Sequence, residues 1–429
     1  MKGKRIYANE RHFMELPKID LKNIEFPKVD IKKLKTALSE KTASGDNTEI
    51  SFNKPDENKD LFMLDGRLAD HGIDMWRQMF IGHNKETGDE KIFFIDFIAV
   101  NPGHGGPDPV FGQLPENKKS GKRPSYLMIH AGAYGEKPIQ LQRYFGWDNV
   151  TIKADAPFLL SADNCFLSES RTLGMIGVSE EEAAEHPEWM TNAGNMIWDL
   201  KIDKKIAFNA GYGTGKVFRD SDASQIYWHV QGMKTEYSGD VSLNGVLYHI
   251  DPETSYGYAD KSWGSDIAKP VICLSSSDLY DNKTGERLYN SAFTIGGGNF
   301  RVGPIKLSNK LMSAFWIEGR PYEFNFSKVW TMTRTVAKVK KNKNEIVWRI
   351  EQETPIHKVS AELRSPIKEM VRERYESPDG EAYAGNIMSG GSGTGEIRIY
   401  TKKISLKNKW EWELAEELTA SHVLCEYGR

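Results

Sequence analysis

Residues 236–250, Glu-Tyr-Ser-Gly-Asp-Val-Ser-Leu-Asn-Gly-Val-Leu-Tyr-His-Ile, decide the fold. Apolar and polar side chains alternate up to Leu243, and the alternation resumes at Val246 after the dipeptide Asn244-Gly245. Asn-Gly tolerates positive φ at both positions of a two-residue turn, the connection that joins antiparallel strands. The stretch therefore predicts a tight β-hairpin.

Similar runs with a period of two lie on both sides of this hairpin. They are rich in aromatic and β-branched residues, which strands favour, and turn residues separate them. The clearest are 91–100, 126–130, 196–203, 226–230, 313–317, 329–336, 346–350 and 396–400. Many short strands with intervening turns predict an all-β fold of antiparallel sandwiches or barrels.

Helix signals are few. Ser179-Glu-Glu-Glu182 is a capping box, in which the Ser hydroxyl caps a backbone N–H and the Glu reaches back. It predicts a short helix that ends near Pro187. We expect a second short helix at residues 414–423.

The length of 429 residues exceeds what one hydrophobic core usually holds, so we expect two domains. We expect residues 1–60 to form an N-terminal arm, residues 61–267 the first domain and residues 268–429 the second. The boundary is placed within residues 265–270.

The charge and cysteine content exclude several classes of protein. The net charge is −3, from 57 basic and 60 acidic side chains, which gives no reason to expect nucleic acid as a partner. Cys165, Cys273 and Cys425 are too few and too scattered for a disulfide framework. No signal-peptide pattern and no run of ~20 apolar residues is present. We expect a cytoplasmic protein without an integral membrane segment.

Several motifs for phosphate, nucleophile or metal chemistry are incomplete. Residues 211–216 lack the spacing of a phosphate loop. Ser392 invites a nucleophile-elbow interpretation, but Thr394 occupies the place of the last glycine, so we expect a flexible loop. No His-Glu-x-x-His motif exists, so no metal site is predicted, although a zinc or iron site from scattered histidines stays open.

The strongest chemical signal follows the hairpin. Tyr258 and Asp260 are two residues apart and face the same side of a strand, and Tyr256 joins them if the strand has no bulge. In an apolar barrel interior, desolvation raises the pKa of an Asp, and a carboxyl that keeps its proton can deliver it to an alkene or enol. The alternative is structural: Asp260 caps backbone N–H groups and Trp263 plugs the core.

Residues 228–264 resemble the superfamily of carotenoid 1,2-hydratases, tocopherol cyclases and AttH-like lipocalins. The shared element has a Tyr/Trp/His-rich strand, a hairpin with Gly239, Gly245 and Tyr248, and the ending Tyr-Ala-Asp-Lys-Ser-Trp-Gly at 258–264. The rest of the chain fits in architecture only. The resemblance implies two tandem lipocalin-like antiparallel β-barrel domains with few short helices, enclosing an apolar pocket.

The resemblance also implies a set of site residues. The hydratases place a His, a Trp, a Tyr and an Asp in the pocket, which here correspond to His229, Trp228, Tyr258 and Asp260. A slip of one residue would turn His229 outward. Ser262 departs from the Asn or Glu that relatives carry before Trp-Gly. Lys261 is expected on the surface.

These features predict a cofactor-independent enzyme acting on a small hydrophobic molecule, isoprenoid, steroid-like or fatty. We expect hydration, double-bond isomerisation or cyclisation, with Asp260 as acid, Tyr258 as its orienting partner and His229 as second proton carrier. Trp228, Trp263 and Tyr256 are expected to contact substrate, since aromatic faces stabilise a developing cation. A non-catalytic carrier or sensor of a lipophilic ligand is the alternative. A collapsed, purely structural barrel is a third. The oligomeric state is left open.

Overall fold

A computed structural model describes residues 52, 60–155, 157–208, 225–267, 269–302, 305–326, 332–380, 383–404 and 410–428. Residues 49–429 form one compact unit. Most of the predicted arm, residues 1–60, and the glycine-rich motif at residues 211–216 lie outside the described residues.

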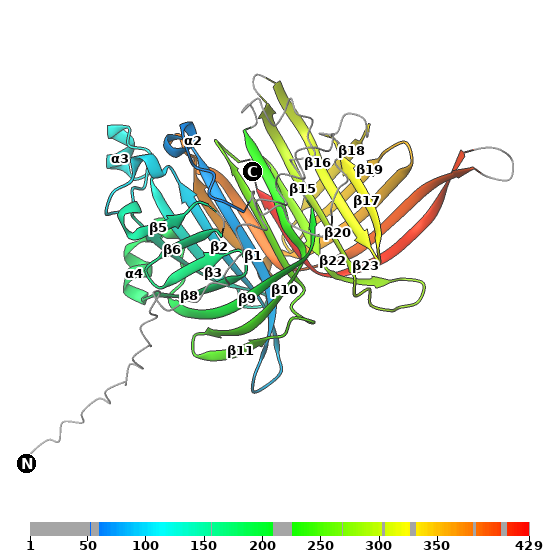
Figure 1. Cartoon of the computed structure of the whole chain (residues 1–429), viewed down its shortest axis with the longest axis horizontal. Coiled ribbons are helices and arrows are strands. Elements are labelled where there is room, and N and C mark those ends of the chain that lie inside the picture. Colours follow the sequence, from blue (N-terminus) through cyan, green and yellow to red (C-terminus); the bar gives the residue numbers. More distant parts are fainter. Residues whose placement is uncertain are drawn as a thin grey trace, which may run out of the picture. The chain divides into compact units, whose positions relative to one another are not determined.

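The first of two antiparallel sheets closes into a barrel (Figure 1). It follows the order β4-β3-β2-β1-β11-β10-β9-β8-β7-β6-β5, and β12 pairs with both β1 and β10. Its strands are β1 (Ile73–Asn84), β2 (Glu90–Val100), β3 (Tyr126–Tyr134), β4 (Ile139–Phe145), β5 (Val150–Lys153), β6 (Leu159–Ala162), β7 (Cys165–Ser168), β8 (Arg171–Val178), β9 (Gly194–Phe208), β10 (Ile226–Leu243), β11 (Val246–Ile250) and β12 (Gly257–Gly264).

The second sheet follows in sequence, and its order is β17-β16-β15-β13-β23-β22-β20-β19-β18. In addition, β14 pairs with β23, and β21 pairs with β22. Its strands are β13 (Val271–Ser276), β14 (Asp278–Asp281), β15 (Ser291–Val302), β16 (Ile305–Ile317), β17 (Arg320–Asn325), β18 (Arg334–Lys341), β19 (Glu345–Glu353), β20 (His357–Pro366), β21 (Val371–Glu376), β22 (Tyr383–Ile404) and β23 (Trp410–Gly428).

The prediction of an all-β chain with two tandem antiparallel units is therefore confirmed. The first sheet ends at Gly264 and the second begins at Val271, on either side of the expected boundary. The separation of 61–267 and 268–429 into two domains stays a prediction, because residues 49–429 pack as one compact unit.

Helices are short and few in the described part of the chain: α2 (Arg67–Asp70), α3 (Pro115–Ser120) and α4 (Glu180–Glu185). The capping box that starts α4 is confirmed, since the Ser179 hydroxyl accepts from the backbone N–H of Glu182 and Glu182 accepts from that of Ser179. Single 3₁₀ turns are η3 (Pro102–His104), η4 (Trp147–Asn149), η5 (Pro187–Trp189) and η7 (Ile367–Glu369).

The predicted hairpin is also confirmed. Leu243 of β10 pairs with Val246 of β11, and the two turn residues between them have positive φ, 50° at Asn244 and 82° at Gly245. A β-carbon is unfavourable at such angles, and glycine lacks one while asparagine tolerates them better than most residues, so Asn-Gly is the suitable pair here.

Two local predictions in the second half are wrong. The expected helix at residues 414–423 is part of β23, and the expected flexible loop around Ser392 is part of β22. Leu414 and Leu418 are four residues apart, as on a helix face, but pairing of β23 with β22 overrides this local pattern. The glycines around Ser392 therefore lie within β22, which pairs with β20 on one side and with β23 on the other.

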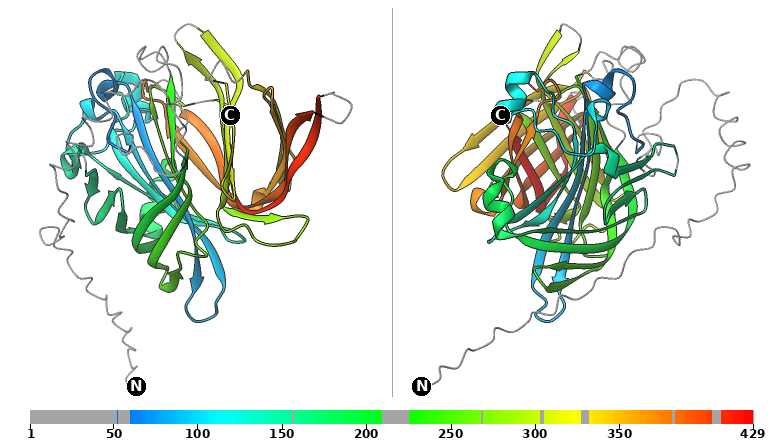
Figure 2. Two further views of the ribbon diagram at one scale, coloured as in Figure 1. Left: turned by 45° about the vertical axis from the view of Figure 1, so that its right-hand side comes forward. Right: turned by 90° about the vertical axis from the view of Figure 1, so that its left-hand side faces the viewer.

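Each sheet surrounds its own apolar core. The core of the barrel contains Trp76, Phe93 and Trp198, and the core of the second sheet contains Phe293 and Trp348. In the barrel strands, the residues between these core positions face the other way. They pack against residues of the second sheet, and the ribbons of the two sheets are drawn from two further sides in Figure 2.

A third buried cluster therefore lies between the two sheets. Met79, Phe94 and Tyr258 of the barrel meet Cys273 and Leu424 of the second sheet there. This buried layer is the part of the fold that positions the site.

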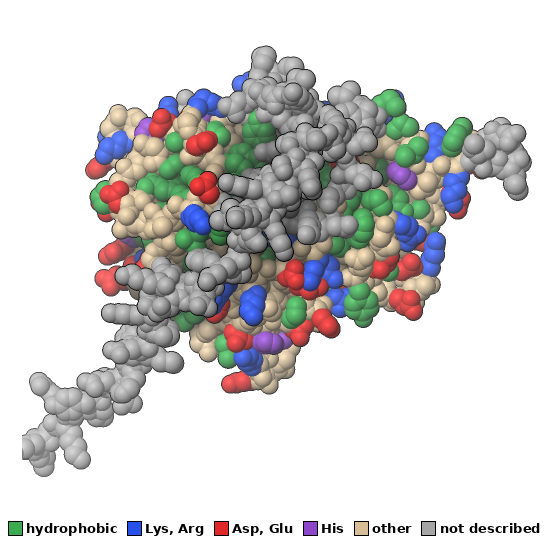
Figure 3. Space-filling model, viewed as in Figure 1, with side chains coloured by type: hydrophobic (Ala, Val, Ile, Leu, Met, Phe, Trp, Pro, Cys, Tyr) green, Lys and Arg blue, Asp and Glu red, His purple; other side chains and the backbone are tan. Residues whose placement is uncertain are grey.

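The remaining global features agree with the sequence. Cys165, Cys273 and Cys425 are free and buried. Among the described helices, none has the length and apolar character required to span a bilayer. On the face drawn in Figure 3, the described acidic and basic side chains are intermixed, which fits the near-balanced charge.

Candidate active site between the two sheets

Strand β12 divides the predicted site residues between two opposite faces. It pairs with β1 on one side and with β10 on the other. Tyr258, Asp260 and Ser262 point to one face, whereas Lys261 and Trp263 point to the other, because successive side chains of a strand alternate.

On the first face, three predicted residues come together. The indole Nε1 of Trp228 donates a hydrogen bond to Oδ2 of Asp260 at 2.8 Å, and the Tyr258 hydroxyl donates to the same oxygen at 2.9 Å. Asp260 is 7% exposed. Within the described chain, no hydrogen bond reaches Oδ1, so this oxygen is the one that can carry a proton.

The location of this group differs from the prediction. Tyr258 and Asp260 were expected in the interior of a barrel, but their face is directed at the second sheet. The Tyr258 hydroxyl lies 3.7 Å from Sγ of Cys273 in β13. The reason is register: the residues of β12 on the barrel side are Ala259 and Lys261, which pair with Gln78 and Trp76.

Gly296 of β15 makes room for Trp228 across this interface. A β-carbon at position 296 would lie 2.4 Å from the Trp228 ring, closer than real atoms approach. Only glycine allows the indole to reach Asp260 without a shift of the strand.

We expect Gly296→Ala to displace the Trp228 indole and lower the free energy of unfolding by about 1–3 kcal/mol, the usual cost of overpacking. Denaturant unfolding monitored by circular dichroism measures this. Gly106→Ala is the matched control, because a β-carbon there meets nothing within 4 Å. Equal stability of the two variants would contradict the close contact.

Burial is the largest influence on the titration of this group. It raises the pKa of Asp260, and the Arg77 charge and the hydrogen bonds from Trp228 and Tyr258 oppose it only in part. Burial likewise raises the pKa of the Tyr258 hydroxyl well above its ordinary value. Asp260 thus retains a proton at higher pH than an exposed Asp.

A charged network that the sequence analysis missed adjoins Asp260. Arg77 lies opposite Asp260 in the strand register and donates to Glu426 of β23. Its guanidinium also lies 3.4 Å from Asp96 of β2 and 3.4 Å from Glu373 of β21. Burial raises the pKa of Glu426 to about 8. One arginine from the barrel is therefore surrounded by carboxyl groups of both sheets.

The approach to Asp260 is apolar. Met75 of β1, Ile226 of β10 and Val271 of β13 are half-buried, as are Trp228 and Ser262. Met75 and Trp228 both pair with Ser262, so these side chains form one row on the Asp260 face. Inward from it come the row of Arg77 and Asp260 and then the row of Met79 and Tyr258, which is buried. Half-buried apolar side chains therefore lie on the same face of the sheet as the Asp260 carboxyl.

His229 and Trp263 lie on the opposite face, which corrects their expected position. His229 pairs with Lys261, and its Nε2 lies 3.6 Å from Oδ1 of Asp60, on the barrel side of the sheet. Trp263 stacks on Tyr227. A one-residue slip was expected to turn His229 out of the barrel, whereas here His229 faces the barrel side and Asp260 faces the second sheet.

Lys261 was expected on the surface and is instead fully buried. Its Nζ lies 2.6 Å from Oδ1 of Asp74, between the rings of Trp76 and Trp263 at 4.5 and 4.8 Å from their centroids. Burial lowers the pKa of Lys261 and raises that of Asp74. Aromatic faces thus replace part of the hydration that the ammonium loses.

Tyr256 does not join Tyr258, because it precedes β12 and has φ of 39°. Its ring stacks on His422 of β23 at a centroid distance of 5.2 Å. His422 contacts Asp278 at 2.7 Å and Glu90 at 2.8 Å, which raises its pKa from 6.5 to about 9 against the opposing effect of burial.

We expect His422 to make stability pH-dependent. Because the folded state binds the proton more tightly, the stabilisation is complete below about pH 6.5 and is lost as the pH rises through about 9. Its full size is on the order of 3 kcal/mol. Denaturant unfolding of wild type and His422→Gln across this range measures it. A constant difference between the two proteins would contradict the assignment.

Comparisons with known proteins give distant structural similarity only. No family model and no curated protein matches the sequence. The structure is similar to a proposed AttH from Nitrosomonas europaea, at 10% identity over 82% of this chain and 93% of that chain, with a TM-score of 0.40. It is also similar to kievitone hydratase from Nectria haematococca, at 10% identity over 89% of this chain and 96% of that chain, with a TM-score of 0.40. CghA is similar at 10% identity over 90% of this chain and 95% of that chain, with a TM-score of 0.40. Because these TM-scores are low, only the geometry of this chain supports the proposals below.

Proposed function

We propose that this chain is an enzyme that protonates a C=C bond or an enol of a hydrophobic molecule, with Asp260 as the acid. The observation that carries the proposal is the environment of one carboxyl group: buried, and bonded through a single oxygen to Trp228 and Tyr258. Both groups donate to Oδ2, so the acidic proton belongs on Oδ1. A neutral carboxylic acid in an apolar site is a competent general acid.

The surrounding residues suit a carbocation-like intermediate. The Trp228 ring lies beside the carboxyl, and an aromatic face stabilises positive charge that develops on carbon. The half-buried side chains of Met75, Ile226 and Val271 offer an apolar surface for a hydrocarbon body. Once the proton has moved, the Asp260 carboxylate can take a proton back from the cation in each case. Loss from a neighbouring carbon gives an isomer, loss from a captured water gives an alcohol, and loss after attack by a second double bond gives a ring.

The substrate class is inferred from this chemistry as isoprenoid, steroid-like or fatty. The proposed proton transfer uses no organic cofactor. His229 was predicted to carry a second proton, but it lies on the barrel side of β10, and Glu426 lies instead on the Asp260 side. We therefore propose Glu426 for that role.

Incubation with unsaturated lipids in D₂O tests the proposal. Mixtures of polyprenyl, steroid and fatty unsaturated compounds are incubated with the protein and analysed by mass spectrometry against a heat-denatured control. We expect a product with one carbon-bound deuterium, with or without the mass of an added water. A ligand that is retained but recovered unchanged indicates a carrier, and no retained ligand indicates a structural protein; either result overturns the proposal.

A further inference from the structure

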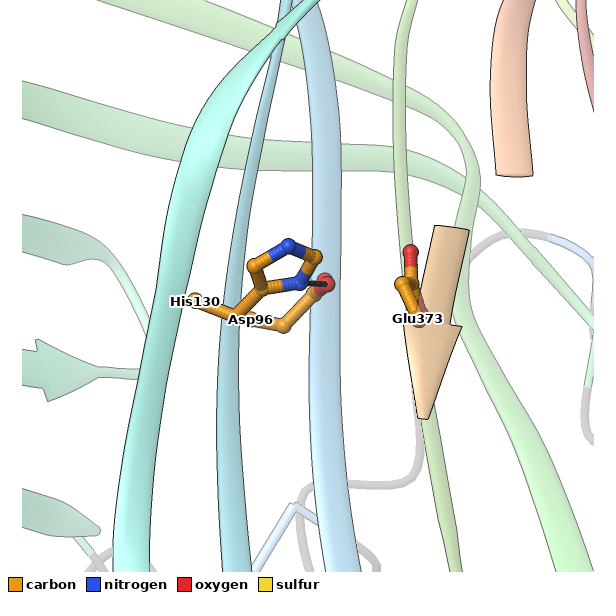
Figure 4. A group of neighbouring side chains, drawn as sticks. All are labelled: Asp96, His130 and Glu373. Atoms are coloured by element: carbon orange, nitrogen blue, oxygen red, sulfur yellow. Dashed lines mark hydrogen bonds and ion pairs between the residues drawn. The ribbon is translucent and has the colours of Figure 1, made fainter. Parts of the chain in front are cut away.

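We infer that Asp96, His130 and Glu373 bind a divalent metal ion that links the barrel to the second sheet (Figure 4). Asp96 and His130 are direct partners on the neighbouring strands β2 and β3, and Glu373 comes from β21 on the other side of the interface. One nitrogen or oxygen of each lies within 4.8 Å of those of the other two, and all three residues are buried.

The orientation of the His130 ring is the first argument. The Gln140 amide nitrogen donates to the backbone carbonyls of Met190 at 2.6 Å and Arg372 at 3.0 Å, so its oxygen must face His130. That oxygen lies 3.3 Å from Nε2, which must therefore carry a hydrogen. In neutral histidine, Nδ1 then has only a lone pair, and it faces Oδ2 of Asp96 at 3.2 Å.

Two acceptors at this distance need a cation or a proton between them. Metal-binding histidines typically donate their second N–H to an oxygen, which fixes the ring as Gln140 does here. The alternative is a doubly protonated His130 paired with Asp96, and the two cases are experimentally distinct.

The carboxylates supply the second argument. Arg77 approaches Oδ1 of Asp96 and Oε2 of Glu373, which leaves Oδ2 of Asp96 and Oε1 of Glu373. In the described chain, Oε1 of Glu373 has no hydrogen-bond partner although the side chain is only 1% exposed. A buried carboxylate oxygen without a partner is costly, and a metal ion satisfies it.

The balance of charge around Arg77 also favours a bound cation. Asp96 and Glu373 both lie beside the single guanidinium of Arg77, which Glu426 also contacts. One guanidinium cannot offset both carboxylates, and a divalent ion between Asp96 and Glu373 would supply the missing positive charge. One imidazole and two carboxylates suit Zn²⁺, with Mn²⁺ as the next candidate.

Metal content and thermal stability test this inference independently of any enzymatic activity. Protein treated with chelator is titrated with ZnCl₂ or MnCl₂, gel-filtered, and analysed by elemental mass spectrometry and thermal unfolding. We expect one ion per chain and a higher melting temperature with metal, because an ion that binds only the folded state stabilises it. Glu373→Gln and His130→Gln should abolish both effects. Gln140→Met should weaken binding by about 10- to 100-fold.

His249→Gln is the control, because His249 also pairs with an Asp, Asp240 at 3.0 Å, but on the surface. It should bind metal like wild type. Absence of a bound ion in wild type would overturn the inference, and ¹⁵N NMR would then show both His130 nitrogens protonated. An ion that persists in both Glu373→Gln and His130→Gln lies elsewhere and also overturns it. Because the readouts need no substrate, they are unaffected if the proposed catalysis fails.

Discussion

Asp260→Asn is expected to lose on the order of 100- to 10,000-fold in kcat, the usual contribution of a general acid. The amide oxygen still accepts hydrogen bonds from Trp228 and Tyr258, but the amide has no acidic proton to transfer. Steady-state turnover of whichever compound gains deuterium in the D₂O experiment measures this loss.

The same substitution should leave the fold intact. Burial disfavours the charged form of Asp260, and Asn imitates the neutral form, so we expect an unchanged or slightly higher melting temperature. Asp240→Asn, at an exposed position of β10, is the control for activity and should match wild type. Wild-type turnover by Asp260→Asn would remove Asp260 from the mechanism. A cooperative unfolding transition in that variant would show that any loss is chemical.

Lys261→Met is expected to lower the free energy of unfolding by about 3–5 kcal/mol, because removal of one partner of a buried ion pair leaves the other uncompensated. Asp74 would keep the backbone N–H groups of Met63, at 2.8 Å, and Met75, but no positive charge, and its fully buried carboxyl would have to take up a proton. Urea unfolding near neutral pH measures the loss.

A double variant separates the effect of the two charges on stability from the effect of side-chain packing. Lys261→Met with Asp74→Leu removes both charges, and apolar replacement of a whole buried pair is often neutral. We therefore expect it to regain most of the stability that Lys261→Met loses. Lys205→Met, at an exposed Lys paired with Asp203, should change stability by no more than about 1 kcal/mol. Equal effects of Lys261→Met and Lys205→Met would contradict the importance of the buried pair.

The proposed acid was predictable from local sequence, but its surroundings were not. The spacing of Tyr258 and Asp260 places both on one face of any strand, and the Trp228 hydrogen bond agrees with the grouping that the motif implied. Arg77 and Asp96 were visible only as isolated charges in apolar strands. Glu373 and Glu426 lie hundreds of residues from Arg77, and no local pattern connects them to it.

Pairing between distant segments decided which face of each strand points to the barrel core and which points to the second sheet. Lys261 alternates with Asp260 and was expected in water, because a strand of one sheet usually has a dry and a wet face. Here the second sheet covers the outer face of the barrel, so both faces of β12 are buried and the charges on each require partners. For the same reason, His229 and Trp263 could not be assigned to the Asp260 side without the register of β10 and β12.

The sequence by itself determined the all-β class, the Asn244-Gly245 hairpin, the capped helix α4 and the shared orientation of Tyr258 and Asp260. These features follow from turn chemistry and from the period of a strand, which act over a few residues. Only the tertiary structure decided that residues 414–423 form a strand and that the acid faces a second sheet. It also decided that Asp96, His130 and Glu373 meet, because backbone pairing and burial join residues whose separation in sequence leaves no periodic trace.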